Sequence, residues 1–480
     1  MEWFSSSDDW LSRWILERGL ALTYAVAFLT TINQFRPLLG ERGLMPAPRF
    51  LASVSVRRAP SVFHLRYSDR LLAVAGWVGV VVAGSLLIGL PQRAPLGVAL
   101  LAWLALWILY LSVVNIGQTF YGFGWETLLL EAGFLAVFLG NSETQPPVLI
   151  MWLVRWLLFR LELGAGLIKM RGDPCWRDLS CLDFHHETQP MPNPLSRWAH
   201  RRPRLWHRVE VLANHGAQLV VPWFLFAPEP VATGAALIVV VTQAWLVVTG
   251  NFSWLNILTI VLALSVVDGS LLAGVLTVDP PDPLRSAPLW HDGMVVPVTA
   301  GVLVLSFWPV RNMLSRRQRM NTSFNPLRLV NSYGAFGSVT RVRREIVVEG
   351  TADRSLDPES VWMPYEFKGK PGDVCRRPRQ VAPYHLRLDW LMWFAALSPQ
   401  RGRGWFRPLV GKLLEGDAAT LRLLARNPFP DEPPTFVRAR LYRYRYSTRD
   451  ERRSTGAWWS RTLEGEYLRP VRLRARQPRT

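Results

Sequence analysis

Cysteine and lysine are scarce in this sequence. Three cysteines, Cys175, Cys181 and Cys375, are too few for a disulfide scaffold, and their odd number leaves at least one thiol unpaired within the chain. Only four of the 55 basic residues are lysine, a bias that indicates a GC-rich genome more than a mechanism. We find no internal repeat, and we expect no cleavable signal peptide, because the segment before the first apolar run is acidic rather than basic.

Positive charge is concentrated in the last third of the chain. The formal net charge is +19, and residues 311–480 hold 34 basic against 16 acidic residues, a net +18. Such a segment could bind nucleic acid or an anionic bilayer, since both gain free energy when Arg and Lys neutralise phosphates. Half of all residues are hydrophobic and 23 are Trp, which is too apolar for a simple soluble enzyme. We therefore expect the lipid bilayer as a partner, and no nucleic acid.

Long apolar runs predict a membrane domain. A bilayer core of about 30 Å needs about 20 apolar residues per helix, and nine segments approach that length. Six are strongly apolar: 71–90, 96–114, 148–168, 231–249, 254–278 and 294–308. Three are short or carry polar residues: 15–35, 125–139 and 209–226. The sequence thus predicts a polytopic α-helical membrane bundle with about eight or nine spans.

The pattern changes after Trp308, where "RNMLSRRQRM" forms a basic stop. Beyond it, "REIVVEG", "WMPYEFKG" and "FVRARLYRYRY" are rich in β-branched and aromatic residues between Pro, Gly and Asp breaks, which predicts strands. "DWLMWFAAL" and "WFRPLVGKLLEGDAATLRLLAR" predict helices. We expect a transmembrane domain over residues 1–310, with a polar loop at 166–208, and a soluble α+β C-terminal domain over residues 311–480.

The distribution of arginine bears on orientation, because basic loops tend to stay in the cytoplasm. With nine spans, the Arg-rich connections 36–70 and 169–208 and the segment after Arg311 fall on one side of the membrane. The rule assigns that side to the cytoplasm, although losing any one weak span would separate the three segments.

Charged and polar side chains inside predicted spans need partners. Arg155, Arg160 and Glu162 lie in one span, and Glu126 and Glu131 of the preceding short span are their expected ion-pair partners. The complete membrane polar cluster is Arg155, Glu162, Glu210, Asn214, Gln218 and Asn251. One interpretation is structural pairing within the bundle, and the other is a buried functional cavity.

Three residues could supply a base for catalysis. Lys169 lies between an apolar wall and a polar loop in "GAGLIKMRGD", where a lowered pKa would suit a base. His215 with Glu210 is a second arrangement of this kind. Each has a structural alternative, namely a lysine that reaches the membrane interface and a histidine that hydrogen-bonds between helices.

The loop at 166–208 allows three states of its cysteines. Cys175 and Cys181 are close enough to bridge in an oxidising compartment. With His185 and His186 they also offer the ligand types of a zinc site, although the spacing is poor. Two unlinked thiols are the third alternative. Three prolines in "ETQPMPNPLS" fix an extended, rigid path, which suits a loop that presents side chains for recognition.

Long motifs in this chain resemble those of the lipase maturation factor family. They are "LELGAGLIKMRGDPCWRDLSCLDFHHETQPMPNPLSRW", "VEVLANHGAQLVVPWFLF", "GNFSWLN", "NSYGAFGSVTRVRREIVVEG", "YEFKGKPGD", "RRPRQVAPYHLRLDWLMWFAAL", "LLEGD", "NPFPDEPP" and "GAWWSR", in that order from residue 151 to the end. The resemblance implies a membrane protein without catalysis that helps secreted lipases to fold and assemble. In eukaryotic members it acts in the endoplasmic reticulum membrane, with the C-terminal domain in the lumen.

The resemblance also suggests an origin and an alternative function. "RARQPRT" lacks a KDEL-like signal, and with the arginine bias this favours a bacterial member located in the plasma membrane. The family is also remotely similar to vitamin K-dependent carboxylases, in which a lysine after a Gly-containing helix end is the base. Lys169 in "GLIK" occupies the corresponding place, so a membrane enzyme of that type is the alternative.

The leading prediction is a folding factor that needs no cofactor and no metal ion, with a secreted lipase or another exported protein as client. Exposed aromatic residues would cover the apolar surface of the client. The predicted client contacts are Trp176, His185, His186, Glu187, Tyr442, Tyr444 and Tyr446. A weaker third hypothesis is an anionic-lipid-binding module from Arg311 onward.

Overall fold

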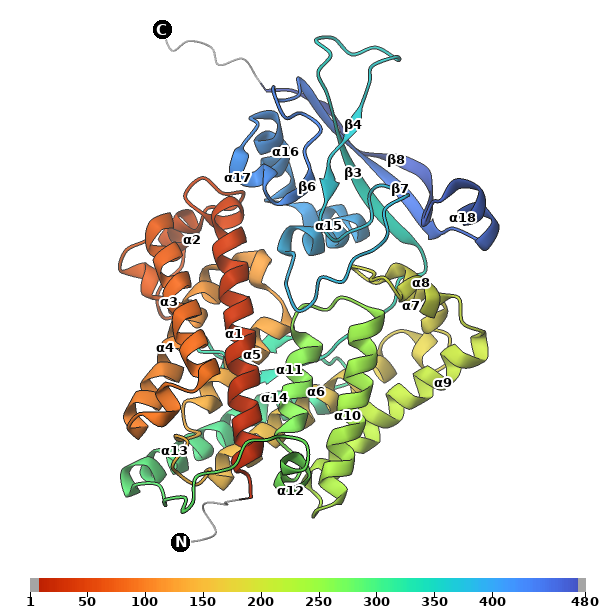
Figure 1. Cartoon of the computed structure of the whole chain (residues 1–480). Coiled ribbons are helices and arrows are strands. Elements are labelled where there is room, and N and C mark those ends of the chain that lie inside the picture. The colour runs from red at the N-terminus through yellow and green to blue at the C-terminus, as the bar shows by residue number, and fades with distance from the viewer. Residues whose placement is uncertain (1–7, 474–480) are drawn as a thin grey trace.

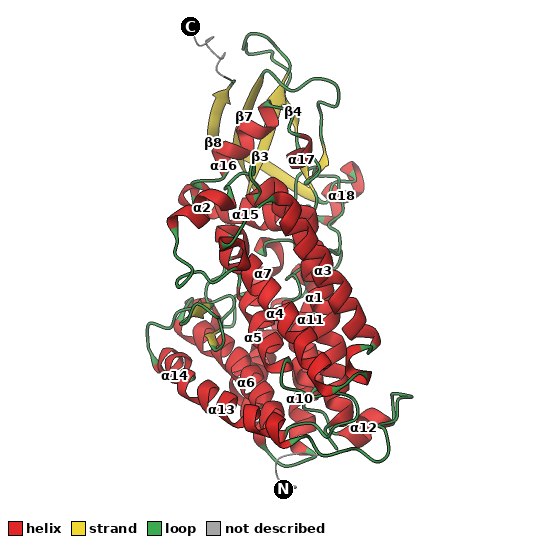
Figure 2. Ribbon diagram, turned by 90° about the vertical axis from the view of Figure 1, so that its left-hand side faces the viewer, coloured by secondary structure: helices red, strands yellow, loops and turns green. Residues whose placement is uncertain are grey.

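The computed structural model describes residues 8–473 as a helical domain capped at one end by a domain built around a sheet (Figures 1 and 2). The helical part contains α1 (Trp10–Leu39), α2 (Ala47–Ser53), α3 (Asp69–Ile88), α4 (Leu96–Ile116), α5 (Gly124–Ala136), α6 (Val148–Arg171), α7 (Leu182–Thr188), α8 (Ser196–His200), α9 (Arg204–His215), α10 (Val231–Thr249), α11 (Leu255–Leu264), α12 (Gly269–Ala273), α13 (Leu289–Leu305) and α14 (Phe307–Leu314). A π-helical turn (Gly216–Val220) and a 3-10 turn (Val221–Phe226) follow α9.

Five helices within residues 8–473 are long and apolar enough to cross a membrane: Trp10–Leu39, Asp69–Ile88, Leu96–Ile116, Val231–Thr249 and Leu289–Leu314. The expected count of eight or nine spans is not confirmed. α5 and α11 have only 13 and 10 residues, and α6 carries Arg155, Arg160 and Glu162. The segment 209–226 breaks into three short pieces, with Pro222 in the last.

The C-terminal domain holds four main helices and a four-stranded antiparallel sheet. Its elements are β3 (Arg343–Thr351), β4 (Met363–Pro364), β5 (Glu366–Phe367), α15 (Arg387–Leu397), α16 (Phe406–Leu414), α17 (Ala418–Leu421), β6 (Leu424–Arg426), β7 (Phe436–Tyr446), α18 (Arg449–Thr455) and β8 (Trp459–Val471). The sheet order is β4-β3-β7-β8, and β5 pairs separately with β6. The predicted strands "REIVVEG" and "FVRARLYRYRY" are confirmed as β3 and β7.

Two sequence predictions within this domain need correction. We expected residues 405–426 to be helical with a break at Gly416. The break is confirmed, since α16 ends at Leu414 and Gly416 turns the chain with φ +63, but the last residues of the segment form the strand β6 rather than a helix. The long edge strand β8 was not predicted from the sequence. Apart from Trp459, its side chains are exposed or half-buried, so it lacks the apolar alternation that marks a half-buried strand.

The polypeptide after α14 stays with the helices for longer than the sequence suggests. We expected the soluble domain to begin at residue 311, but α14 packs on α6, and β1 (Thr322–Ser323) pairs with β2 (Asn331–Ser332) beside α5 and α6. Asn331 donates from Nδ2 to Glu131 in α5 (2.9 Å). The sheet of the C-terminal domain begins only at Arg343, after this segment has packed against α5 and α6.

The three Arg-rich segments predicted to share one side do lie at the same end of the bundle. The C-terminal end of α1, the loop with α7 and α8, and the C-terminal domain meet there, while the Trp10 end of α1 and α12 lie at the opposite end (Figure 1). A single hydrophobic core runs from Tyr24 and Trp103 in the bundle to Trp405 and Val437 in the C-terminal domain. The two domains are therefore packed together rather than linked by a free tether.

Candidate functional site

Lys169 occupies the C-terminal end of α6, where the bundle meets the polar loop. Its side chain is buried, with 4% exposed. Nζ donates to Oδ1 of Asn214 at 2.7 Å and to Oε1 of Gln218 at 2.8 Å, and it lies 4.8 Å from the centre of the Trp176 ring. The lysine is therefore held by protein acceptors and does not reach outward to the membrane interface.

Glu162 lies about two turns before Lys169 in α6, and side-chain amides bind its carboxylate. Gln218 donates to one carboxylate oxygen at 3.1 Å, and Gln243 donates to the other at 2.6 Å. Asn256 in turn donates to Oε1 of Gln243 at 2.6 Å. This chain of hydrogen bonds joins four helical elements. Sequence reasoning missed Gln243, whose signal is a single amide in the otherwise apolar helix α10.

Glu210 and the histidines near it do not form a single catalytic group. Trp245 donates to Oε1 of Glu210 at 2.6 Å, and His186 Nε2 lies 3.8 Å from that same oxygen. His215 turns away, and its Nε2 lies 2.9 Å from the carbonyl oxygen of Trp176. The predicted pair of His215 and Glu210 is thus separated, and His186 is the histidine beside the carboxylate.

The charged residues that the sequence predicted to pair within the bundle each have a contact. Arg160 pairs with Glu131, as the sequence suggested. Glu126 instead binds Arg387 of the C-terminal domain at 2.6 Å. Arg155 is apart from Glu162 and stacks on Trp152, at 5.3 Å from the ring centre.

Asn251 also serves the contact between the two domains. Its Oδ1 accepts hydrogen bonds from the backbone N–H groups of Val381 (2.7 Å) and Ala382 (2.9 Å). Its Nδ2 donates to the carbonyl oxygen of Arg379 at 2.9 Å. The bundle therefore uses part of its polar cluster to hold one loop of the C-terminal domain.

The cysteines of the polar loop are joined to each other. Cys175 and Cys181 form a disulfide with a Cα–Cα distance of 4.8 Å, and Cys375 is free and exposed. Bonded cysteines cannot act as thiolate ligands, so the zinc alternative lacks two of its four residues. Within residues 8–473, no group of three His, Cys, Asp or Glu side chains could hold a metal ion.

Asp173 fixes the start of the disulfide loop. Its carboxylate accepts hydrogen bonds from the backbone N–H of Cys175 (3.1 Å) and of Val339 (3.3 Å). Arg341 donates to both oxygens, at 2.8 and 3.0 Å. The Arg341 guanidinium, with the two backbone donors, holds the pKa of Asp173 below its usual range.

The second half of the loop is clamped to the sheet through Arg343. This buried guanidinium donates to the carbonyl oxygens of Glu187 (2.9 Å), Gln189 (2.6 Å) and Pro190 (3.0 Å), and pairs with Glu345 at 2.5 Å. The start of the proline-rich segment is therefore docked onto β3.

The predicted client contacts have little exposed surface, and their role in client contact stays a prediction. Trp176, His185, His186, Tyr444 and Tyr446 are buried, and Glu187 and Tyr442 are half-buried. Glu187 accepts a hydrogen bond from the backbone N–H of Tyr446 (2.7 Å), and the Tyr446 ring stacks on Trp459. Glu187 and Tyr446 therefore bind the loop to the C-terminal domain, and the five buried side chains expose little surface that a client protein could contact.

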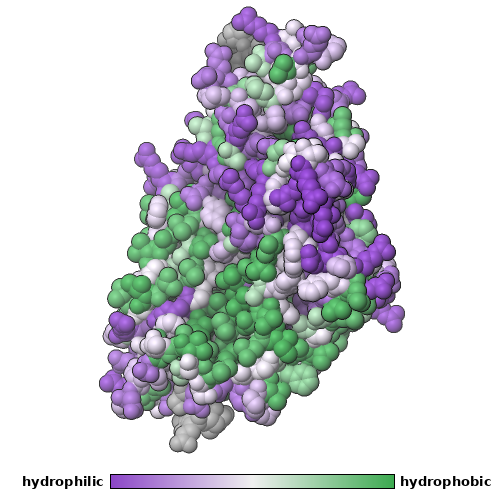
Figure 3. All heavy atoms as spheres, turned by 45° about the vertical axis from the view of Figure 1, so that its right-hand side comes forward, coloured by the Kyte–Doolittle hydropathy of each residue, from purple (hydrophilic) through white to green (hydrophobic). Residues whose placement is uncertain are grey.

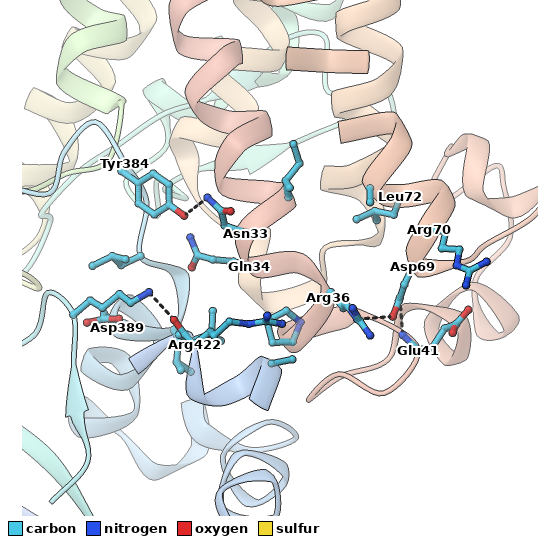
Figure 4. A pocket seen from close by; sticks show the side chains of 18 of the residues that line it. Asn33, Gln34, Arg36, Glu41, Asp69, Arg70, Leu72, Tyr384, Asp389 and Arg422 are labelled. Carbon is cyan, nitrogen blue, oxygen red and sulfur yellow. Dashed lines mark hydrogen bonds and ion pairs between the residues drawn. The ribbon is translucent and has the colours of Figure 1, made fainter. Parts of the chain in front are cut away.

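A second feature is a wide cleft of about 990 Å³ between the two domains. Exposed charged residues of both domains line it, among them Arg36, Glu41, Arg70, Lys368 and Arg422. Figure 4 shows Asn33 and Tyr384 facing each other across the junction, with Nδ2 of Asn33 3.3 Å from the Tyr384 hydroxyl. This cleft therefore has exposed charged side chains that another molecule could contact.

Comparison with known proteins decides the family. Residues 11–274 match the lipase maturation factor transmembrane domain, and residues 329–469 match the lipase maturation factor C-terminal domain. The chain belongs to the lipase maturation factor family. The two matches cover the helical bundle and the sheet domain, in the order in which the two domains occur in this chain.

Individual relatives of this lipase maturation factor family member align over nearly the whole chain. It is 43% identical to lipase maturation factor 1 of Bos taurus, over 96% of this chain and 89% of the relative. It is 42% identical to lipase maturation factor 1 of Homo sapiens (98% and 89%) and 29% identical to lipase maturation factor 2 of Homo sapiens (96% and 83%). These relatives are eukaryotic and give no support to the expected bacterial origin. No solved structure matches the chain.

Proposed function

We propose that this chain is a membrane-bound maturation factor that assists the folding and assembly of secreted lipases. The observation that carries the proposal is the match of both family domains, in order, with 43% identity to lipase maturation factor 1 of Bos taurus over nearly the full length. The packed junction between the domains supports a single working unit.

The test is rescue of lipase secretion. Cells without their own lipase maturation factors would express a secreted lipase with or without this chain, and active lipase in the medium would be compared with total lipase protein. We expect active lipase to rise while total lipase synthesis stays constant. If active lipase stays at background although the membrane protein is abundant, the proposed function is wrong.

The junction cleft is the surface we propose for client contact. Its exposed charges of both signs, on both domains, suit a polar and irregular partner such as an incompletely assembled protein surface. Arg70→Glu and Arg422→Glu each reverse one of these charges without removing a buried group. We expect both variants to lower active lipase output at unchanged abundance. Arg57→Glu is the matched control, because Arg57 is an exposed arginine in the connection that leads to α3 but lies outside the cleft.

We propose that the C-terminal domain faces the secretory side of the membrane, which is the lumen of the endoplasmic reticulum in a eukaryotic cell. The disulfide of the polar loop supports this orientation, because such bonds persist in oxidising compartments. The loop and the C-terminal domain lie at the same end of the bundle (Figure 1). Large folded domains translocate largely regardless of charge, so the arginine count of this end is the weaker argument.

The second candidate function is a membrane enzyme that uses Lys169 as a base. The observation in its favour is that Lys169 is buried against Asn214 and Gln218 in a bundle cavity. Lys169→Ala would separate the two functions. A base-dependent enzyme would lose its activity at normal abundance, whereas a folding factor whose loop stays folded would keep its effect on lipase secretion.

A further inference from the structure

A cavity of about 550 Å³ opens on the side of the bundle that we expect to face the membrane. It shares no lining residue with the junction cleft. Residues of α6, α9, α10 and α11 line it, together with the polar loop. Its rim is apolar and exposed, with Trp206 48%, Val209 57% and Val241 68% exposed. Val241 lies on α10, which is long and apolar enough to span a bilayer, so we expect this side of the rim to face lipid. Figure 3 shows apolar side chains gathered over the helical part and polar ones over the C-terminal domain.

The inner end of the same cavity is polar. Lys169, Asn214 and Gln218 line it. An ammonium group has three N–H donors, and among the described residues only Asn214 and Gln218 accept hydrogen bonds from Lys169. One donor therefore remains for a further acceptor.

His186 is the strongest sign of a ligand site. It lines the cavity and is only 2% exposed. Within residues 8–473 neither ring nitrogen has a hydrogen-bond partner, and its Nε2 lies 3.8 Å from Oε1 of Glu210, which is too far for a hydrogen bond. Oε2 of the neighbouring Glu210 is also buried without a partner. Buried polar groups are nearly always hydrogen-bonded, because leaving them unpaired costs free energy. A ligand with oxygen atoms in its polar head would satisfy these groups.

We propose that this cavity binds a single-chain lipid with a small oxygen-bearing head. The acyl chain would lie along the apolar rim between α9 and α10, and a carboxylate or glycerol-ester oxygen would accept hydrogen bonds from Lys169 and His186. A volume of about 550 Å³ falls within the usual range of ligand pockets, about 300–1,000 Å³. Apolar walls with a few convergent polar groups are typical of such sites.

The test is photo-crosslinking of the full-length protein in phosphatidylcholine nanodiscs with an oleate analogue that carries a diazirine on its chain. Labelled peptides would be identified by mass spectrometry. We expect saturable labelling on α9 and α10 that excess unlabelled oleate or monoolein removes. Labelling that does not saturate, and that is equal on the lipid-exposed helix α3, would overturn the proposal.

A matched pair of variants separates the cavity from the bilayer around it. Ala213→Phe places a ring inside the cavity at an exposed position, whereas Leu212→Phe enlarges the neighbouring residue, which is exposed but lies outside the cavity. We expect Ala213→Phe to reduce saturable labelling about tenfold, and Leu212→Phe to leave it unchanged. Equal labelling in both variants would exclude a bound lipid here. If Ala213→Phe does not fold, Val241→Phe on the opposite rim replaces it.

The relative competition by oleate and by monoolein distinguishes the two kinds of polar head group. If the head is a carboxylate, oleate competes better than monoolein, and Lys169→Met removes that advantage. If it is a glycerol ester, monoolein competes better, and Lys169→Met weakens both competitors. If neither lipid competes, the proposed ligand class is wrong, whatever the outcome of the lipase secretion assay.

Discussion

At the scale of the residue, Arg343 is the side chain on which the contact between loop and sheet depends most. Replacing it with Met leaves three carbonyl oxygens and part of the Glu345 carboxylate without their donor. Breaking a buried ion pair of this kind costs about 3–5 kcal/mol. We expect Arg343→Met to lower the free energy of unfolding by that amount, measured by denaturant unfolding of the purified protein in detergent and followed by tryptophan fluorescence.

The adjacent residue provides the control for Arg343. Arg344 pairs with Glu464 at 2.6 Å on the exposed face of the same strand. Surface pairs contribute about 0–1 kcal/mol, so Arg344→Met should change the unfolding midpoint little. Equal losses in the two variants would contradict the clamp.

Asp173 gives the disulfide loop a predictable response to acid. Its pKa in the folded protein is lowered from the ordinary value of 3.8 by Arg341 and by two backbone N–H donors. A lowered folded pKa means that the carboxylate stabilises the fold above the unfolded pKa, and that this contribution is lost as the pH falls through the folded pKa. We expect Asp173→Asn to lower the unfolding temperature at neutral pH, and the difference from the parent protein to vanish below the folded pKa.

The exposed Asp178 in the same loop is the comparison for this pH effect. Asp178→Asn should follow the parent protein at every pH. A difference between Asp173→Asn and the parent that persists unchanged into acid would show that the carboxylate charge of Asp173 is not what stabilises the loop.

At the scale of the element, the disulfide loop is a small structural unit with its own contribution to stability. Cys175 and Cys181 are six positions apart, and closing so short a loop stabilises a fold by about 2 kcal/mol through the unfolded chain. We expect the double variant Cys175→Ser, Cys181→Ser to lose that amount in denaturant unfolding and to become insensitive to reductant. Cys375→Ser should retain the parent stability, since this exposed thiol is free.

Some elements could be predicted from the sequence because their own side chains carry the signal. β3 and β7 combine β-branched and aromatic residues with clear breaks, and α15 is apolar from Trp390 to Leu397. Apart from Trp459, the side chains of β8 are exposed or half-buried, and the strand gave no such signal. The count of eight or nine spans is not confirmed, because an apolar segment such as α6 resembles a span although it carries charged residues and buries most of its side chains in the bundle.

The candidate site was predicted in composition but not in arrangement. Lys169, Asn214, Gln218 and Glu162 were recognised because polar residues are costly among apolar ones. The pairing of Glu126 with Arg387 joins residues 261 positions apart, which no local periodicity can reveal. The burial of the predicted client contacts could not be predicted, because a Cys/His/Pro-rich loop looks the same in sequence whether it faces solvent or a second domain.

At the scale of the whole molecule, polar groups in the bundle hold the C-terminal domain in place. Gln34 binds His385 and Arg387 through their backbone groups, and Glu126 binds the Arg387 side chain. Asn251 binds the preceding loop. These contacts, together with the continuous hydrophobic core, fix the domain on one end of the bundle, so that its orientation follows from the membrane topology.

That orientation can be measured with one thiol at each end of the bundle. Cys375 is exposed on the C-terminal domain, while Asp279 is exposed in the connection between α12 and α13, at the opposite end (Figure 1). In sealed microsomes, we expect a membrane-impermeant maleimide to reach Cys375 only after detergent opens the vesicles. In a Cys375→Ser, Asp279→Cys variant the thiol should react before detergent is added. The bridged Cys175 and Cys181 should react in neither case, so they do not confuse the labelling. The reversed labelling pattern would place the C-terminal domain in the cytosol and would rule out its direct contact with a lipase inside the secretory pathway.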